Sequence, residues 1–297
     1  MNTYQIKLKV NSGILTPFQA DTIFGHLCWV VAHHEGEQGL MDFLEPFKEG
    51  KPPFVISDGF PGELFPKPLS ADFITQEPDK DIKKTIWINM EDFNKIREGK
   101  EFLPKKVVES GFKSISTTHS YINRITNTTG EDSLYSLEEI IVKDYDYISI
   151  YLKVISDEWK DKVVRLLEKL SQTGYGRKKS IGKGHFSVDE VASYSVNGIK
   201  DANGFVALSN FCPAENDPTE GLYKTFVKYG KLGEEFTFCG NPFKRPLLMI
   251  KTGSVFKTEG QPKEYYGRMV DKIAPAKESE VVQYGYAFPI PIRYPIA

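Results

Sequence analysis

The sequence has little cysteine and no long apolar segment. Its three cysteines, Cys28, Cys212 and Cys239, are far apart and odd in number, so they fit neither a disulfide framework nor a metal-binding pattern. No stretch approaches the length of a membrane span, and the N-terminal residues contain no apolar core of a signal peptide. We therefore expect a cytoplasmic protein with no membrane association and no metal site.

Nucleotide-cofactor motifs are also lacking. The glycine-rich segment has five residues between Gly176 and Gly182 where a P-loop has four, and no hydroxyl follows Lys183 to hold Mg²⁺. The dinucleotide fingerprint fails too, because Lys179 and Ser187 stand where its third glycine should fall. We expect no small-molecule cofactor.

Neither sign of charge dominates the chain. It has 38 Lys and Arg residues against 40 Asp and Glu residues, a net charge of −2. A nucleic-acid-binding protein of this composition must concentrate its cations locally.

The densest such concentration is the segment 174–186, GYGRKKSIGKGHF, which we call the glycine loop. Glycine permits positive φ angles and leaves backbone N–H groups uncovered, and cations attract phosphate. Its glycines are Gly174, Gly176, Gly182 and Gly184, and its cations are Arg177, Lys178, Lys179 and Lys183. We predict that it binds a polyanion backbone, with backbone N–H groups completing the cradle. The alternative is a flexible, solvated helix-to-strand loop.

Hydrophobic periodicity predicts the regular elements of the first 190 residues. Alternation predicts strands at 4–10, 147–155 and about 185–191, and helical spacing predicts helices at 21 to about 32 and from 156 to about 173. Residues 35–80 are rich in Gly and Pro, which predicts an ordered segment with little regular secondary structure. A short strand at 84–89, a helix at 91–97 and a polar hairpin at 119–135 follow.

The predicted fold class is α+β. Residues 1–190 fit a βαββαβ ferredoxin-like, RRM-like unit with an insertion at about 80–140 that contains the hairpin. Residues 191–297 predict a smaller, β-rich domain. One interpretation is that this second domain is a degenerate copy of the first domain. The prolines in 281–292 confine that segment to a sheet edge or an extended tail.

Four segments, taken together, resemble the RAMP superfamily of CRISPR proteins, and within it the type III-A (Csm) subunits that cap the 5′ end of the guide RNA. These segments are TPFQADTIFGHLCW at 16–29, the hairpin with its Asn-Arg-x-Thr core, the glycine loop, and YGYAFPIPIR at 284–293. The resemblance runs along the whole chain in order. In the glycine loop the matching residues are Gly182, Lys183 and Gly184, and in the hairpin they are Asn123 and Arg124.

The resemblance implies a non-catalytic RNA-binding subunit of an antiviral effector complex. It implies two ferredoxin-like domains with the 5′ tag of the guide crRNA bound between and across them, and a thumb hairpin that distorts the guide–target RNA duplex. The implied protein partners are the large polymerase-like signalling subunit and the repeated backbone subunit.

We predict RNA contacts from three groups of residues. In the glycine loop they are Gly174, Tyr175, Gly176, Arg177, Lys178, Lys179, Gly182, Lys183 and Gly184; in the hairpin, His119, Asn123 and Arg124; and in the second domain, Lys244, Arg245, Ser254, Lys257 and Arg268. Tyr175, Tyr135, Tyr147 and Tyr151 are candidates for stacking on unpaired bases.

Two other classes of function stay open. The first is a metal-independent CRISPR endoribonuclease that processes guide RNA, with His26 on the polar face of the first helix as general acid or base. The second is a purely protein-binding scaffold, which the hairpin and the proline-rich tail would serve equally well.

Overall fold

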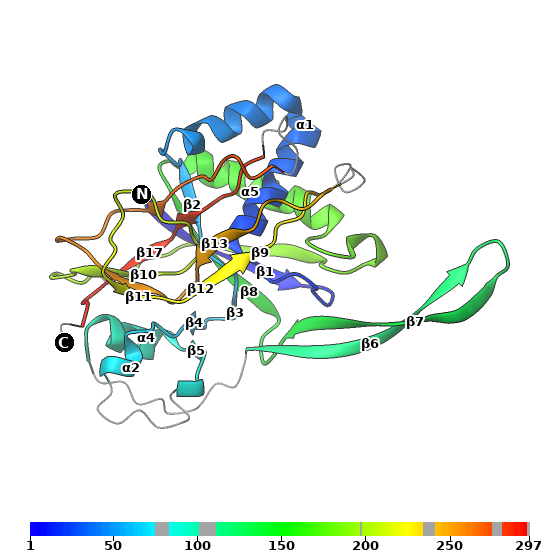
Figure 1. Cartoon of the computed structure of the whole chain (residues 1–297). Helices are drawn as coiled ribbons and strands as arrows, with labels where there is room; N and C mark the ends of the chain where they lie inside the picture. The colour runs from blue at the N-terminus through cyan, green and yellow to red at the C-terminus, as the bar shows by residue number, and fades with distance from the viewer. Residues whose placement is uncertain (75–82, 101–110, 197, 234–240, 275–280, 296–297) are drawn as a thin grey trace.

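The computed structural model describes residues 1–74, 83–100, 111–196, 198–233, 241–274 and 281–295. It is a mixed α/β structure with several antiparallel sheets and few helices (Figure 1). Within these ranges no helix combines the length and the apolar character that crossing a membrane requires.

A central antiparallel sheet organises the first half. Its strands are β1 (Asn2–Val10), β2 (Phe54–Ile56), β8 (Tyr147–Val154) and β9 (Phe186–Ser193), in the order β2-β8-β1-β9, and β3 (Phe60–Pro61) also pairs with β8. Strand β1 lies between β8 and β9, with Ile6 opposite Ile150 and Val191. The apolar residues Ile6 and Leu8 are buried, as the alternation in the sequence predicts.

Two helices cover one face of this sheet (Figure 1). They are α1 (Ala20–Lys48) and α5 (Asp157–Thr173). Helix α5 buries Val163, Leu166 and Leu170 at the predicted helical spacing. The order of elements is therefore strand, helix, strand, strand, helix, strand.

Helix α1 is longer than predicted. Gly36 has non-helical φ and ψ angles of 74° and −172° and forms a kink, after which the helix continues to Lys48. Phe43 and Phe47, one turn apart, pack beside Phe24. The expectation of little regular structure from residue 35 onward is wrong for this stretch, because the aromatic pair stabilises a helix that the local composition disfavours.

The segment after β2 carries short elements that pack on the other face of the sheet. They are β4 (Phe65–Pro66), α2 (Ala71–Ile74), β5 (Trp87–Ile88) and α4 (Met90–Arg97). Phe60 and Phe65 lie against Tyr151, and Phe288 approaches it from the second half. Both faces of the sheet are thus covered around Tyr151.

A long hairpin projects from the body (Figure 1). It consists of β6 (Phe112–Asn123) and β7 (Thr128–Val142), paired from Phe112–Val142 to Asn123–Thr128. We call this hairpin the thumb. It includes the predicted hairpin and extends farther toward the body on both strands.

The second half is β-rich. Strands β10 (Gly204–Ala207), β11 (Gly221–Leu222), β14 (Val255–Lys257) and β17 (Pro289–Ile292) form an antiparallel sheet in the order β11-β14-β10-β17. Strand β12 (Thr225–Lys228) pairs with β13 (Leu247–Ile250), and β15 (Tyr266–Gly267) with β16 (Tyr286–Ala287). Strand β17 lies at an edge, as its prolines predict. The part of this half that the structure describes contains no α-helix.

The two halves share one hydrophobic core. It joins Ile6 and Phe24 of the first half to Val206, Tyr284 and Phe288 of the second. Polar contacts add to it: Lys228 donates to the Asp21 carboxylate at 2.9 Å, and Gln283 donates to the same carboxylate at 2.6 Å.

The start of α1 is capped by a residue far away in the sequence. The Asp58 carboxylate accepts the backbone N–H of Ala20 at 2.8 Å, whereas the N-cap residue Gln19 makes no side-chain cap bond. Asp58 also accepts from the Asn210 N–H at 3.4 Å. Burial raises the pKa of this carboxyl to about 7.

We predict that Asp58→Asn raises stability at neutral and higher pH. Because the folded-state pKa lies above the ordinary value of 3.8, folding binds a proton between about pH 4 and about pH 7, and the free energy of unfolding falls as the pH rises through this window. An asparagine oxygen still accepts the Ala20 N–H but does not titrate. The variant should gain up to about 4 kcal/mol at about pH 8. Urea unfolding at about pH 5 and about pH 8 measures this; parallel pH profiles of the two proteins would contradict it.

Candidate nucleic-acid interface

The connection between β1 and α1, residues 11–19, holds the glycine loop in place. The Gly184 N–H donates to the Gly13 carbonyl at 3.0 Å, and the His185 N–H donates to the Ser12 hydroxyl at 2.9 Å. At the other end of the loop, the Arg177 N–H donates to the Thr16 hydroxyl at 3.1 Å. The glycine loop is therefore fixed at both ends rather than free in solvent.

Positive φ angles shape the glycine loop. Gly174 has φ 84° and ends α5, with its N–H donating to the Leu170 carbonyl at 3.0 Å. Gly176, Lys178, Gly182 and Gly184 also have positive φ, and a single 3-10 turn, η1 (Lys179–Ile181), lies between them. At Gly184 a Cβ atom would lie 1.9 Å from the Tyr175 carbonyl oxygen, so only glycine fits there.

The backbone N–H groups of the glycine loop are largely satisfied within the protein. The Gly176 N–H donates to His26 of α1, and those of Arg177 and Gly184 donate to residues of the β1–α1 connection. The N–H groups of Gly182 and Lys183 donate to carbonyls inside the loop. The prediction of a backbone cradle for phosphate is therefore wrong for these groups.

Tyr175 is part of the core. It is 0% exposed, its ring stacks on Phe18 with centroids 4.1 Å apart, and its hydroxyl donates to the Pro17 carbonyl at 2.8 Å. The expectation that Tyr175 stacks on an RNA base is corrected: this ring attaches the loop to the body. Tyr151 is likewise 1% exposed and cannot stack on a base.

His26 also supports the glycine loop. Its Nε2 accepts the backbone N–H of Gly176 at 3.1 Å, and its ring lies 4.9 Å from that of Tyr175. A nitrogen that accepts this bond is unprotonated. In this arrangement Nε2 positions the loop.

The four cations of the loop differ in their surroundings. Arg177 and Lys178 are exposed, and neither forms an ion pair within the described ranges. The Lys178 ammonium lies 5.5 Å from the ring centroid of Tyr135 on the thumb. Lys179 is half-buried. Lys183 donates to the Glu139 carboxylate at 2.6 Å and is 19% exposed, so its charge is compensated inside the protein.

Glu139 joins the thumb to the glycine loop. Its carboxylate accepts from Lys183 and from the Thr117 hydroxyl at 2.5 Å, and these bonds lower its pKa. The neighbouring strand residue Ile140 exchanges two backbone hydrogen bonds with Ile14, at 3.0 and 2.7 Å. The base of the thumb is thus held by the same β1–α1 connection as the glycine loop.

The other predicted thumb residues lie farther out. His119 stacks on Tyr135 with centroids 5.6 Å apart and shares a hydrogen bond with Thr117 at 3.1 Å. Asn123 and Arg124 are exposed at the turn between β6 and β7. Tyr147, also a stacking candidate, lies on the body and donates to Glu63 at 2.9 Å.

The predicted residues of the second half do not form one group. Ser254 is 0% exposed and donates to the Lys251 carbonyl at 2.6 Å, so its predicted RNA contact is corrected. Lys244 donates to Val282 and Gln283 oxygens, and burial lowers its pKa. Lys257 pairs with Glu220 at 3.0 Å. Arg245 and Arg268 are exposed.

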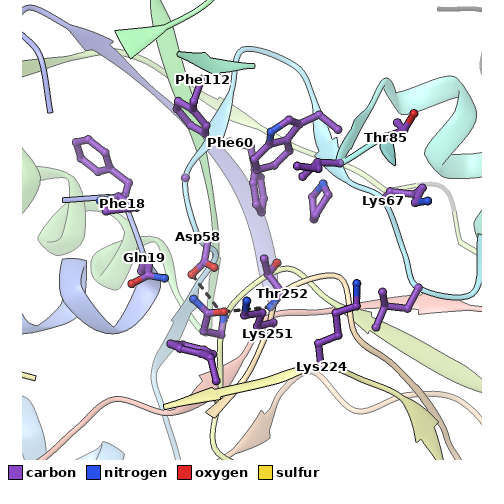
Figure 2. Close-up of a pocket in the computed structure, with 18 of the residues that line it drawn as sticks. Phe18, Gln19, Asp58, Phe60, Lys67, Thr85, Phe112, Lys224, Lys251 and Thr252 are labelled. Atoms are coloured by element: carbon purple, nitrogen blue, oxygen red, sulfur yellow. Dashed lines mark hydrogen bonds between the residues drawn. The ribbon is translucent and has the colours of Figure 1, made fainter. Parts of the chain in front are cut away.

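A cleft of about 570 Å³ lies between the two halves and was not predicted. Figure 2 shows Phe60 and Phe112 on one side, and Lys224 and Lys251 on the other. Its residues come from eight separate segments of the chain, which explains why no local motif revealed it. Among the described residues, no group of three or more His, Cys, Asp or Glu side chains is placed to hold a metal ion.

The class of protein follows from comparison with known families. A model described as the RAMP superfamily matches residues 10–187, which is more than half of the chain and includes α1, the thumb and the glycine loop. The chain belongs to the RAMP superfamily. No curated protein matches it in sequence.

Solved structures share the fold over the full length. A chain in the crystal structure of a Csm1–Csm4 cassette in complex with pppApA has a TM-score of 0.64 and 17% identity, with 100% of both chains covered. A chain in the Csm3–Csm4 subcomplex of the type III-A CRISPR-Cas interference complex has a TM-score of 0.61 and 16% identity, also with 100% of both covered. At these identities the similarity establishes the fold alone.

We predict that Gly184→Ala detaches the glycine loop, whereas Gly182→Ala does not. Both glycines have positive φ, which costs an alanine about 1–2 kcal/mol. A Cβ at position 184 would also meet the Tyr175 carbonyl oxygen, while the space around Gly182 is open. The free energy of unfolding should fall by about 3 kcal/mol or more in the first variant. Chemical unfolding measures both proteins; equal losses would mean that space at position 184 is unimportant.

Proposed function

We propose that this protein is a non-catalytic RNA-binding subunit of a type III-A CRISPR (Csm) effector complex that serves antiviral defence in the cytoplasm. Its membership of the RAMP superfamily supports a role in a CRISPR system. The full-length fold similarity is to chains from structures of Csm1–Csm4 and Csm3–Csm4 assemblies, and Csm4 is the component that both have in common.

One observation carries the RNA-binding role. Arg177 and Lys178 are exposed, have no acidic partner among the described residues, and lie on a loop held at both ends at the base of a projecting hairpin. Tyr135, 39% exposed, offers an aromatic face beside Lys178. Two exposed cations on a backbone held in place, beside an aromatic ring, suit a sugar-phosphate backbone with a base that stacks.

The arrangement of elements supports the architecture expected of such a subunit. We propose two ferredoxin-like domains, at 1–190 and 191–297, the first with β2-β8-β1-β9 as its sheet and α1 and α5 as its helices. The proposed RNA ligands are the 5′ tag of the guide crRNA at the glycine loop and the guide–target duplex at the thumb. The proposed protein partners are the large signalling subunit and the repeated backbone subunit.

The non-catalytic role is supported by His26. Its Nε2 accepts the Gly176 N–H, so a proton-transfer role for this nitrogen would break a bond that holds the loop. Incubation of the protein with repeat RNA in EDTA should give binding without cleavage. Specific cleavage that disappears in His26→Ala would favour the endoribonuclease alternative instead.

We predict that the double substitution Arg177→Ala with Lys178→Ala flattens the salt dependence of RNA affinity. Each phosphate contact to single-stranded RNA contributes about 0.7 to the slope of log K against log salt concentration, so the slope should fall by about 1.4. Lys51→Ala with Lys200→Ala removes the same charge from other exposed positions and should leave the slope unchanged. Fluorescence anisotropy over a salt series measures it; equal slopes for wild type and the loop variant would refute the proposal.

A further inference from the structure

One face of the thumb is turned toward the glycine loop. On β7, Tyr135, Leu137 and Glu139 alternate with exposed residues, and their exposed fractions fall from 39% to 7% to 6% toward the body. On β6, Thr117 and His119 are half-buried between exposed neighbours and pair with Leu137 and Tyr135. Because successive residues of a strand point to opposite faces, these side chains share one face, which we call the inner face of the thumb.

The glycine loop contacts the inner face at two points. Lys183 donates to the Glu139 carboxylate at 2.6 Å, and the Lys178 ammonium lies 5.5 Å from the ring centroid of Tyr135. Glu139 and Tyr135 lie about 14 Å apart along β7. Because two separated points define a direction, the two contacts together determine the angle between the thumb and the loop.

The contact nearer the body is the more constrained of the two. One Glu139 oxygen accepts from Lys183 and from the Thr117 hydroxyl, and the other oxygen packs against Gly13, where a Cβ atom would overlap it. Both hydrogen bonds lower the pKa of this carboxyl, so it is ionised at neutral pH. Hydrogen bonds to a charged group are short and strong. A buried carboxylate held from three sides therefore limits rotation at the base of the thumb.

The thumb is long enough to amplify a small rotation at its base (Figure 1). Its backbone bonds to the β1–α1 connection form a single bridge, Ile14 with Ile140, and one residue pair resists twisting less than a ladder of several pairs. The stretch of β7 from Glu139 to Thr128 is about 37 Å long. A rotation of about 10° at the base would therefore move the turn by about 6 Å.

The turn of the thumb and the glycine loop carry different parts of the proposed RNA contact. Arg177 and Lys178 lie on the loop, and Asn123 and Arg124 lie at the turn. An RNA that touches both needs their separation to stay constant, because a hydrogen bond weakens steeply once its donor is displaced. The angle of the thumb is therefore a requirement for binding at both places together.

We propose that Glu139 is a positioning residue: by joining Lys183 to Thr117, it fixes the angle of the thumb to the glycine loop and so the distance between their RNA contacts. The consequence for RNA rests on the proposed function, whereas the fixed angle is a property of the protein alone. In the opposite role, Glu139 would withhold Lys183 from phosphate. The two roles predict opposite changes in RNA affinity when the Glu139 charge is removed.

The test measures the angle of the thumb in the full-length protein. Spin labels are attached to a keto amino acid incorporated at two exposed positions, Ile125 at the thumb turn and Arg165 on α5, so the cysteines stay unmodified. Pulsed electron paramagnetic resonance gives the distance between the labels. Glu139→Gln removes the carboxylate charge, and Gly13→Ala displaces the carboxylate with no change of charge. Glu138→Gln, on the exposed face of the same strand, is the matched control.

We expect the distance distribution to broaden by about 6 Å in Glu139→Gln and in Gly13→Ala, and to be unchanged in Glu138→Gln. Fluorescence anisotropy then measures binding of a guide RNA with its 5′ repeat tag, annealed to a complementary target RNA. Affinity should be about threefold to tenfold weaker in Gly13→Ala than in wild type, because the two contact regions are no longer held at a fixed separation. Glu139→Gln should bind more weakly than Glu138→Gln, which has lost the same charge.

The outcomes separate this proposal from the proposed function. A distance distribution that stays narrow in both Glu139→Gln and Gly13→Ala would overturn the positioning role, whatever the RNA result. Tighter RNA binding by Glu139→Gln than by Glu138→Gln would mean that Glu139 withholds Lys183 from phosphate, and would also overturn it. Absence of RNA binding by the wild-type protein would contradict the proposed function, while the distances would still decide whether Glu139 fixes the thumb.

Discussion

The structure depends on the hydrogen bonds that join residues 11–19 to three other parts of the chain. Gly13 accepts from Gly184 of the glycine loop, and Ile14 pairs with Ile140 of the thumb. The start of α1, which directly follows, is capped by Asp58. Because these bonds are made by neighbouring residues of one short connection, the loop, the thumb and the first helix take fixed positions relative to one another. A shift of this connection would move all three.

This arrangement changes the role of glycine in the loop. Gly176 and Gly184 are needed for close approach, to the Thr16 side chain and the Tyr175 carbonyl respectively, and their N–H groups are used in holding the loop. The loop is thus a rigid frame whose exposed cations are set in advance. Rigidity of this kind lowers the entropy lost on binding, because fewer backbone torsions are fixed when a ligand arrives.

Local patterns in the sequence predicted what depends on local physics. Alternation and helical spacing predicted β1, β8 and α5, because burial of one face imposes these periods on the sequence. The prolines predicted that the last strand, β17, lies at a sheet edge, because proline has no N–H to donate. The predictions that failed depend on contacts between residues that lie far apart in the sequence. Tyr175 looked like an exposed ring among cations, yet Phe18 and Pro17 bury it. Thr16, His26 and Glu139 hold the loop from elsewhere in the chain, and no spacing in the sequence reveals those partners. The cleft escaped prediction for the same reason.

The pairing of Lys183 with Glu139 gives one cation of the glycine loop a different role from its exposed neighbours. This ion pair has little exposure and joins the loop to the thumb in one geometry, and the charge of Lys183 is compensated within the protein. Arg177 and Lys178 of the same loop are exposed and form no ion pair within the described ranges. The positive charge that this loop presents to solvent therefore comes from two adjacent side chains, although the chain as a whole has a net charge of −2.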